Sequence, residues 1–153
     1  MDDDLLIRPV GRDDFDQWLV LWDGYNEFYG RSGPTALPRE ITDTTWARFF
    51  DPEEPMHALV AVAEGRLVGL THYLYHRSTT SIPPICYLQD LFTSQAMRGR
   101  GVGKRLIERV SEEARAAGSP RVYWQTHETN ATARRLYDAI AEYSGFLVYR
   151  ITL

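Results

Sequence analysis

The sequence predicts an α/β protein built on one mixed sheet. Its 153 residues suit a single domain spanning 1–153, with enough apolar residues (44%) for a core. Segments with helical periodicity alternate with apolar runs of strand length. A strand hairpin followed by a strand–helix–strand unit requires both antiparallel and parallel pairing. The expected element order is β-α-α-β-β-β-α-β-α-β.

The first third of the chain predicts one strand and two helices. Residues 5–10 have strand character, and the apolar residues of 15–29 recur at helical spacing. Glycines and a proline in 30–34 end that helix. A second helix is expected over 39–50.

The middle of the chain predicts three consecutive strands. Residues 56–63 form an almost unbroken apolar run, and Glu64-Gly65 is a turn before a second strand over 66–77. This arrangement is typical of a β-hairpin. After a longer turn, residues 85–93 form the third strand.

The last third predicts a helix, a strand, a second helix and a final strand. The first helix covers 102–117 and ends at Gly118. We expect the other three elements over 121–126, 130–143 and 146–153. Because a terminal strand has an unpaired edge, the final strand could pair across subunits, and a homodimer is possible.

Composition argues against several classes of protein. The net charge of −4 argues against nucleic acid as the main partner. No run reaches the roughly 18 apolar residues of a membrane span, and the acidic start is unlike a signal peptide, so we expect a cytoplasmic protein without a membrane partner. The single cysteine, Cys86, suits the core, and we expect no metal site.

The most informative motif is the glycine-rich turn 98–103, which joins a predicted strand to a predicted helix. A helix N-terminus has unpaired N–H groups and positive partial charge, and glycines let a ligand approach the backbone, so phosphate is the expected ligand. The dinucleotide and P-loop patterns both fail in this turn. The remaining pattern, [QR]-x-x-G-x-[GA], is filled by Arg98, Gly101 and Gly103.

This turn resembles the acyl-CoA pyrophosphate loop of the GCN5-related N-acetyltransferases, the GNAT family, and the element order resembles that fold over nearly the whole chain. The segment 122–126, followed by Asn130 and Leu136-Tyr137, is most similar to the Hpa-type enzymes. The spermidine/spermine acetyltransferases are a similar group. The resemblance implies transfer of an acetyl group from acetyl-CoA to a primary amine of a small molecule, such as a polyamine or amino acid, or of a peptide.

The resemblance also implies where coenzyme A would lie. Backbone groups of Leu91 and Thr93 would pair with the pantetheine arm as an added strand would. Backbone N–H groups from Arg98 to Lys104 would hold the pyrophosphate, and Asn130 would bind the arm. The implied cofactor residues are Leu91, Phe92, Thr93, Arg98, Gly99, Arg100, Gly101, Val102, Gly103, Lys104, Asn130, Ala133 and Tyr137.

The implied catalytic acid is Tyr137, which would protonate the leaving thiolate. The base is less defined, because Gln89 stands where the spermidine/spermine enzymes have a glutamate, and an amide cannot take a proton. Asp90 and Glu128 are the candidates for a base. Neighbouring strand residues point to opposite faces, which argues against Asp90 facing the substrate.

The acceptor site is expected beside the first two helices. Aromatic faces and carboxylates there suit a cationic amine. We assign Trp18 and Trp22 to the core, and the expected substrate-binding residues are Tyr25, Glu27, Tyr29, Gln89 and Trp124. Two alternatives stay open: a non-catalytic acyl-CoA-binding sensor or regulatory module of the same fold, and a nucleic-acid-binding turn.

Overall fold

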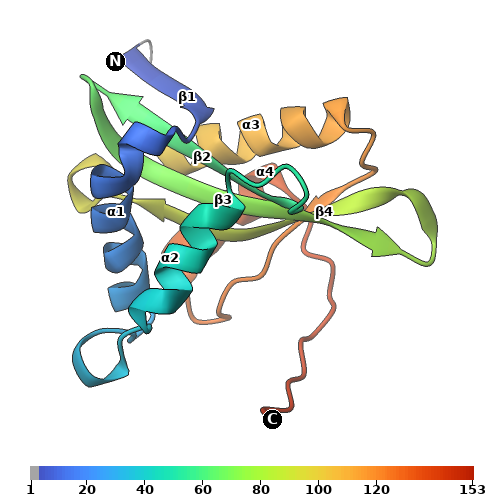
Figure 1. Cartoon of the computed structure of the whole chain (residues 1–153). Coiled ribbons are helices and arrows are strands. Elements are labelled where there is room, and N and C mark those ends of the chain that lie inside the picture. The colour runs from blue at the N-terminus through green and yellow to red at the C-terminus, as the bar shows by residue number, and fades with distance from the viewer. Residues whose placement is uncertain (1–3) are drawn as a thin grey trace.

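Five strands form one mixed sheet in the computed structural model, which describes residues 4–153 (Figure 1). The strand order follows the sequence. Each of the first three strands pairs with the next in antiparallel fashion, and the fifth strand is parallel to the fourth. The predicted mixed sheet is therefore confirmed. The strands are β1 (Leu5–Pro9), β2 (Met56–Ala63), β3 (Arg66–Ser78), β4 (Ser81–Thr93) and β5 (Val122–Tyr123).

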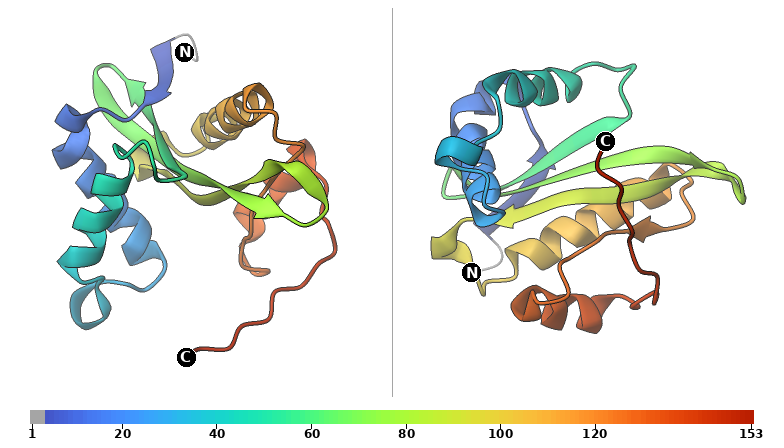
Figure 2. Two further views of the ribbon diagram at one scale, coloured as in Figure 1. Left: turned by 45° about the vertical axis from the view of Figure 1, so that its right-hand side comes forward. Right: turned by 90° about the horizontal axis from the view of Figure 1, so that it is seen from below.

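Helices cover both faces of the sheet, so the molecule has three layers (Figure 2). One face carries α1 (Phe15–Phe28) and α2 (Arg39–Arg48), and the other carries α3 (Val102–Ala116) and α4 (Ala131–Ile140). Short 3-10 turns at Arg12–Asp14, Gly33–Thr35 and Gln95–Met97 connect these elements. No helix within residues 4–153 is both long enough and apolar enough to cross a membrane.

Two apolar clusters hold the layers together. Trp18 and Trp22 of α1 are buried against Val60 and Leu70 of the sheet, as the sequence predicts. On the opposite face, α3 buries its apolar stripe against β1 to β4. Gly69 permits this close approach, because an added Cβ would lie 2.9 Å from Cγ1 of Val102.

A β-bulge interrupts β4 next to the expected site. His72 of β3 is opposite Asp90, and the next residue, Tyr73, is opposite Leu88, so Gln89 is an extra residue in β4. In a regular strand, residues two apart point to the same face, but the extra residue places Leu88 and Asp90 on opposite faces of the sheet. Leu88 stays in the cluster under α3, whereas Asp90 lies on the α1 face beside His72. The alternation argument against Asp90 is therefore wrong.

The C-terminal part differs from the prediction. The strand expected over 121–126 is paired only at Val122–Tyr123, and the helix expected over 130–143 ends at Ile140. The final strand expected over 146–153 is not formed in the described chain, because these residues run away from the sheet and lie beside no strand (Figure 1). The fold class is confirmed, but this last element of the predicted order is wrong for one chain.

Candidate active site

Strands β4 and β5, the parallel pair of the sheet, separate at the position expected for the cofactor. Their paired residues are Cys86 with Val122 and Tyr87 with Tyr123. From Leu88 to Thr93, β4 pairs only with β3 among the described strands. One edge of this stretch is therefore open to a ligand that can pair with its backbone. The stretch includes the predicted residues Leu91, Phe92 and Thr93, all of them half-buried.

The predicted phosphate loop leads directly into α3. Gly99 and Gly101 have φ of 79° and 80°, and no atom lies within 4 Å of a Cβ added to either. Gly101 is the N-cap residue of α3, and no side chain caps the helix. The N-terminus of α3 thus has no side-chain cap and follows two left-handed glycines whose Cα atoms border open space, an arrangement that suits an anion.

The basic side chains of this loop have different partners. Nε of Arg98 donates to the carbonyl of Thr93 at 3.2 Å, and its guanidinium carbon lies 5.5 Å from the centre of the Phe92 ring. Arg100 and Lys104 are exposed, and Nζ of Lys104 lies 3.8 Å from a Glu108 carboxylate oxygen. Val102 is buried in the core. Arg98 therefore ties the loop to β4, and Val102 could offer only its backbone to a cofactor.

The start of α4 closes the other side of this region. Oδ1 of Asn130 accepts the Ala133 N–H at 3.4 Å, so Asn130 caps the helix as well as lying where cofactor binding is expected. A Cβ added to Gly103 would lie 3.8 Å from side-chain carbons of Leu91 and Leu136. Strand β4 and helices α3 and α4 therefore meet at Gly103.

Tyr137 lies on the inner face of α4. Its ring packs edge-on against Trp124, with centroids 5.4 Å apart. Burial raises the pKa of the Tyr137 phenol, and the Tyr29 phenol of the α1 C-terminus raises it further. A raised pKa keeps the phenol protonated at neutral pH, which is the state that a proton donor needs.

Asp90 belongs to a buried polar chain. Its Oδ2 lies 2.9 Å from Nδ1 of His72, and Nε2 of His72 lies 3.1 Å from Nε1 of Trp18. An indole nitrogen can only donate, so Nε2 accepts and Nδ1 carries the proton that His72 donates to Asp90. His72 was not predicted, because only the bulged register shows that it faces Asp90.

Two tyrosines connect Asp90 to the end of α1. Burial raises the pKa of the Tyr25 phenol, and the charge of Asp90 and a hydrogen bond to it add to the shift. The same two causes, burial first and then the Asp90 charge, raise the pKa of the Tyr29 phenol. The Arg31 guanidinium lies over both rings, 5.8 Å from the centre of Tyr25 and 5.5 Å from that of Tyr29.

The remaining predicted residues contribute less to this cluster. Glu27 and Gln89 are exposed, and Trp124 reaches the site through its contact with Tyr137. Glu128 is also exposed, and its backbone carbonyl accepts a hydrogen bond from Arg134. Of the two candidate bases, Asp90 is therefore the one that lies among the aromatic residues of the predicted acceptor site.

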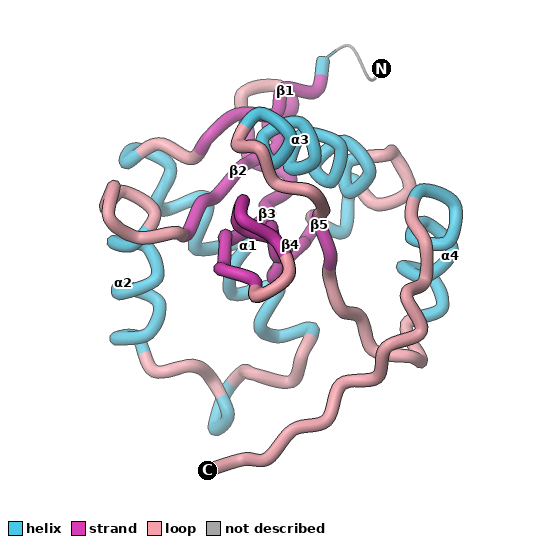
Figure 3. Tube along the Cα trace, turned by 90° about the vertical axis from the view of Figure 1, so that its right-hand side faces the viewer, coloured by secondary structure: helices cyan, strands magenta, loops and turns pink. Residues whose placement is uncertain are grey.

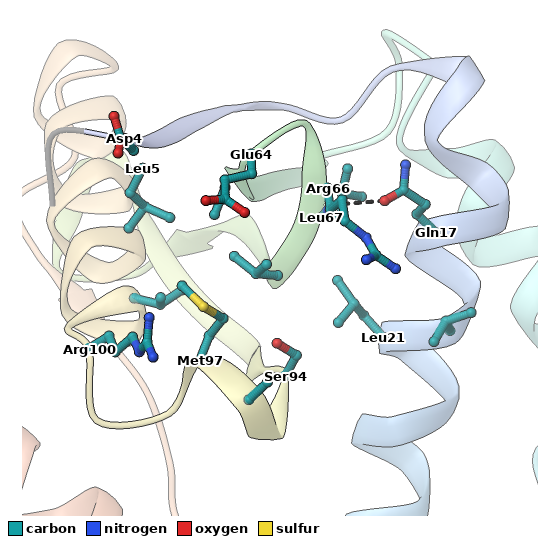
Figure 4. Close-up of a pocket in the computed structure, with 15 residues that line it drawn as sticks. Asp4, Leu5, Gln17, Leu21, Glu64, Arg66, Leu67, Ser94, Met97 and Arg100 are labelled. Carbon is teal, nitrogen blue, oxygen red and sulfur yellow. Dashed lines mark hydrogen bonds between the residues drawn. The ribbon is translucent and has the colours of Figure 1, made fainter. Parts of the chain in front are cut away.

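A hollow of the described chain lies outside this cluster. It has a volume of about 1100 Å³ and opens between α1, the β2–β3 turn and the loop before α3 (Figure 4). Met97 and Arg100 border it from that loop, whereas Asp90 and Tyr137 do not line it. This hollow therefore does not coincide with the predicted catalytic residues.

Comparison of the sequence with known proteins identifies a matching family and several similar proteins. The model of the acetyltransferase (GNAT) family matches residues 18–141. The chain is 32% identical to D-amino-acid N-acetyltransferase HPA3 of Saccharomyces cerevisiae, over 98% of this chain and 92% of that protein. It is 29% identical to aminoglycoside N(6')-acetyltransferase type 1 of Serratia marcescens, over 97% of this chain and 99% of that protein.

Solved structures share the fold at lower identity. An aminoglycoside acetyltransferase from an uncultured soil metagenomic sample, in complex with sisomicin, has a TM-score of 0.82 at 18% identity, covering 99% of this chain and 98% of that one. The aminoglycoside N-acetyltransferase AAC(6')-Iy in complex with CoA has a TM-score of 0.77 at 17% identity, covering 97% and 94%.

Proposed function

This chain belongs to the acetyltransferase (GNAT) family of acetyl-CoA-dependent N-acetyltransferases, and we propose that its acceptor is the primary amine of a small molecule, an amino acid in particular. The observation that carries the proposal is the placement of Asp90 and Tyr137. Burial and the charge of Asp90 raise the pKa of the Tyr29 phenol, and burial and the Tyr29 phenol in turn raise the pKa of Tyr137. Asp90 lies in the stretch of β4 whose edge is open, and Tyr137 packs against the same apolar cluster as Leu91 of that stretch. General base and general acid are the two roles that acetyl transfer to an amine requires.

The residues around the open edge fit coenzyme A. The Arg98 N–H, predicted to bind the pyrophosphate, donates to the Gln95 carbonyl at 3.3 Å, so the N–H groups from Gly99 to Lys104 would hold the pyrophosphate. The backbone of Leu91 to Thr93 would pair with the pantetheine arm. Asn130 and Ala133 lie at the start of α4 on the other side. When bound, acetyl-CoA supplies the acetyl group as a thioester.

In the proposed reaction the two side chains move protons in opposite directions. The amine nitrogen forms a bond to the acetyl carbonyl carbon, the carbon–sulfur bond breaks, and the amine loses a proton while the sulfur gains one. Asp90 would take the proton of the amine, directly or through a water. His72 donates to Oδ2 of Asp90 and so orients the carboxylate. Tyr137 would give its proton to the sulfur.

Charge around the two tyrosines favours an amino acid as acceptor. Asp90 and Arg31 both lie next to Tyr25 and Tyr29, so one negative and one positive group border the same aromatic surface. An amino acid has an ammonium group and a carboxylate that complement this pair, whereas polyamines and aminoglycosides have no carboxylate for Arg31. The name of the yeast relative, a D-amino-acid N-acetyltransferase, supports the same class.

Replacing the proposed acid tests the mechanism. Tyr137→Phe keeps the ring that packs on Trp124 and removes only the hydroxyl. We expect unchanged acetyl-CoA affinity by calorimetry and a kcat lower by roughly 100-fold or more. The matched control is Tyr143→Phe, which removes an exposed hydroxyl and should leave kcat unchanged. An unaltered kcat in Tyr137→Phe would exclude this residue as the acid.

A further inference from the structure

Asn26 is a buried polar residue of α1 that takes no part in the proposed reaction. Its exposed fraction is 4%. The side-chain Nδ2 donates to the Trp22 carbonyl at 2.9 Å, and Oδ1 accepts from Nε of Arg31 at 2.7 Å. A buried amide is costly unless both its ends are hydrogen-bonded. Arg31 therefore satisfies the oxygen of Asn26, and Asn26 in turn fixes one nitrogen of the guanidinium.

The end of α1 brings Arg31 next to Asn26. Gly30 has a φ of 78°, its N–H donates to the Glu27 carbonyl at 2.9 Å, and the Arg31 N–H donates to the Asn26 carbonyl at 2.8 Å. These two bonds form a Schellman motif, in which an apolar contact frequently joins the two positions that Asn26 and Arg31 occupy. In this chain a hydrogen bond to a charged group replaces that contact. Residues 29–38 then lead to α2 as a loop with one short 3-10 turn (Figure 3).

The outer side of the Arg31 guanidinium is unpaired. Within residues 4–153, neither Nη1 nor Nη2 has a hydrogen bond, and no ion pair joins Arg31 to a carboxylate. The loop 29–38 contains no acidic residue. The guanidinium lies over the rings of Tyr25 and Tyr29. With Nε bound to Asn26, the two outer nitrogens remain as a planar fork, which is the geometry that binds a carboxylate through two parallel hydrogen bonds.

We propose that Nη1 and Nη2 of Arg31 bind the carboxylate of the acceptor amino acid, and that Asn26 is the positioning residue that holds this fork in place. The inference rests on the proposed function and names the part of the acceptor that the protein recognises. An arginine side chain has several rotatable bonds, and the bond to Asn26 removes much of that freedom before the acceptor arrives. A group that is ordered in advance binds more tightly, because binding no longer has to order it.

The charges around the two tyrosines suit this arrangement. Asp90 and Arg31 both act electrostatically on the Tyr25 and Tyr29 phenols. In the described chain they form no ion pair with each other, and Asp90 is paired with His72 instead. The opposite charges are therefore both available to a ligand. The carboxylate of an amino acid would lie at Arg31, and its amine would lie on the Asp90 side.

Comparing an amino acid with its amide tests this inference. The two acceptors have the same side chain and a primary amine, but only the amino acid has a carboxylate. Because their amines also differ in pKa, the readout is the change in the ratio of the two kcat/KM values between the native protein and a variant. Arg31→Gln removes the fork, and Asn26→Leu keeps a side chain of similar size without the oxygen that Arg31 uses.

We expect the ratio of amino acid to amide to fall by about 10- to 100-fold in Arg31→Gln and by about 10-fold in Asn26→Leu. The change should come from a higher KM for the amino acid, with the amide constants within about twofold of native. A loss of folded enzyme lowers both rates equally and leaves the ratio unchanged. Arg48→Gln is the matched control, because it removes an exposed guanidinium of α2 and should not change the ratio.

An equal loss with both acceptors would overturn the inference, since it would show that the two residues only support the structure. An unchanged ratio in Arg31→Gln would overturn it as well. A fall in Arg31→Gln alone would disprove the positioning role of Asn26. In these three cases acetylation of the amino acid still supports the proposed function. If the native protein acetylates neither acceptor, the proposed function is wrong and the inference fails with it.

Discussion

Asp90 and His72 are two buried polar residues that face each other across neighbouring strands. Nδ1 of His72 lies 2.9 Å from Oδ2 of Asp90, and the indole N–H of Trp18 donates to Nε2 of the same imidazole. Buried polar groups are stable in this environment only when they are hydrogen-bonded. The hydrogen bond therefore fixes the position of the Asp90 carboxylate next to Tyr25 and Tyr29 of the proposed acceptor region.

Removing the charge of Asp90 should slow acetyl transfer without unfolding the protein. The amide oxygen of Asp90→Asn can still accept from Nδ1 of His72, but an amide cannot take a proton from an amine. We expect kcat to fall by about 10²- to 10⁴-fold. Steady-state thiol release measures this change.

The matched control for Asp90→Asn is Glu128→Gln, which removes the other candidate carboxylate. Glu128 is exposed, so we expect its kcat within about twofold of the native value. A large loss in Glu128→Gln together with normal turnover in Asp90→Asn would reverse the two roles.

The thiol of Cys86 should be inert in the folded protein. Burial raises its pKa to about 12. A raised pKa means that the thiolate is scarce at all pH values well below 12, and the thiolate is the reactive form. We expect no reaction of native protein with an aromatic disulfide reagent at pH 8 and one thiol per chain in guanidinium. Immediate reaction of the native chain would contradict this burial.

For single residues, the sequence predicts burial where the local pattern of apolar residues determines it. The burial of Trp18, Trp22 and Cys86 follows from periodicity and apolar context. His72 could not be found in this way, because its importance depends on the register of β3 against β4. A one-residue bulge changes that register, and nothing in the residue types around Gln89 marks it.

The predicted phosphate loop is continuous with α3, which begins at Val102. The conformations of Gly99 and Gly101 leave the first turn of α3 open, and Gly103 lies against Leu91 and Leu136. The helix dipole and the unpaired N–H groups of this turn attract an anion.

A carboxylate at Gly103 should prevent cofactor binding. Gly103→Glu places negative charge at the N-terminus of α3, where the pyrophosphate would bind, so we expect no detectable acetyl-CoA affinity by calorimetry. Gly103→Ala is the control, because its Cβ would make ordinary 3.8 Å contacts and add no charge. Position 101 is less suitable, since its φ of 80° strains any side chain. Normal affinity in Gly103→Glu would disprove this cofactor position.

Elements with local signals were predictable, and those that need a distant partner were not. The turn at Glu64-Gly65 and the start of α3 at Gly101 have local sequence signals and form as predicted. The strand expected over 146–153 has the right alternation, but a strand also needs a neighbouring edge. In the structure this segment lies along no strand of its own chain, and the sequence pattern does not show this.

Across the whole molecule, the proposed site is assembled from three separate regions of the chain. Tyr25 and Tyr29 belong to the end of α1, Asp90 to β4, and Tyr137 to α4, on opposite faces of the sheet. Strands β4 and β5 pair only at Cys86–Val122 and Tyr87–Tyr123, and Tyr29 interacts electrostatically with both Asp90 and Tyr137. The family resemblance predicts this assembly, whereas hydrophobic periodicity alone predicts only an α/β domain.

The measurement that tests the account most directly is thiol release from acetyl-CoA with D- and L-amino acids, polyamines, aminoglycosides and lysine peptides as acceptors. We predict turnover that is fastest with amino acids and falls by about 100-fold or more in both Asp90→Asn and Tyr137→Phe. No release with any of these amines, while acetyl-CoA still raises the melting temperature, would contradict catalysis of this transfer and leave a protein that only binds acyl-CoA.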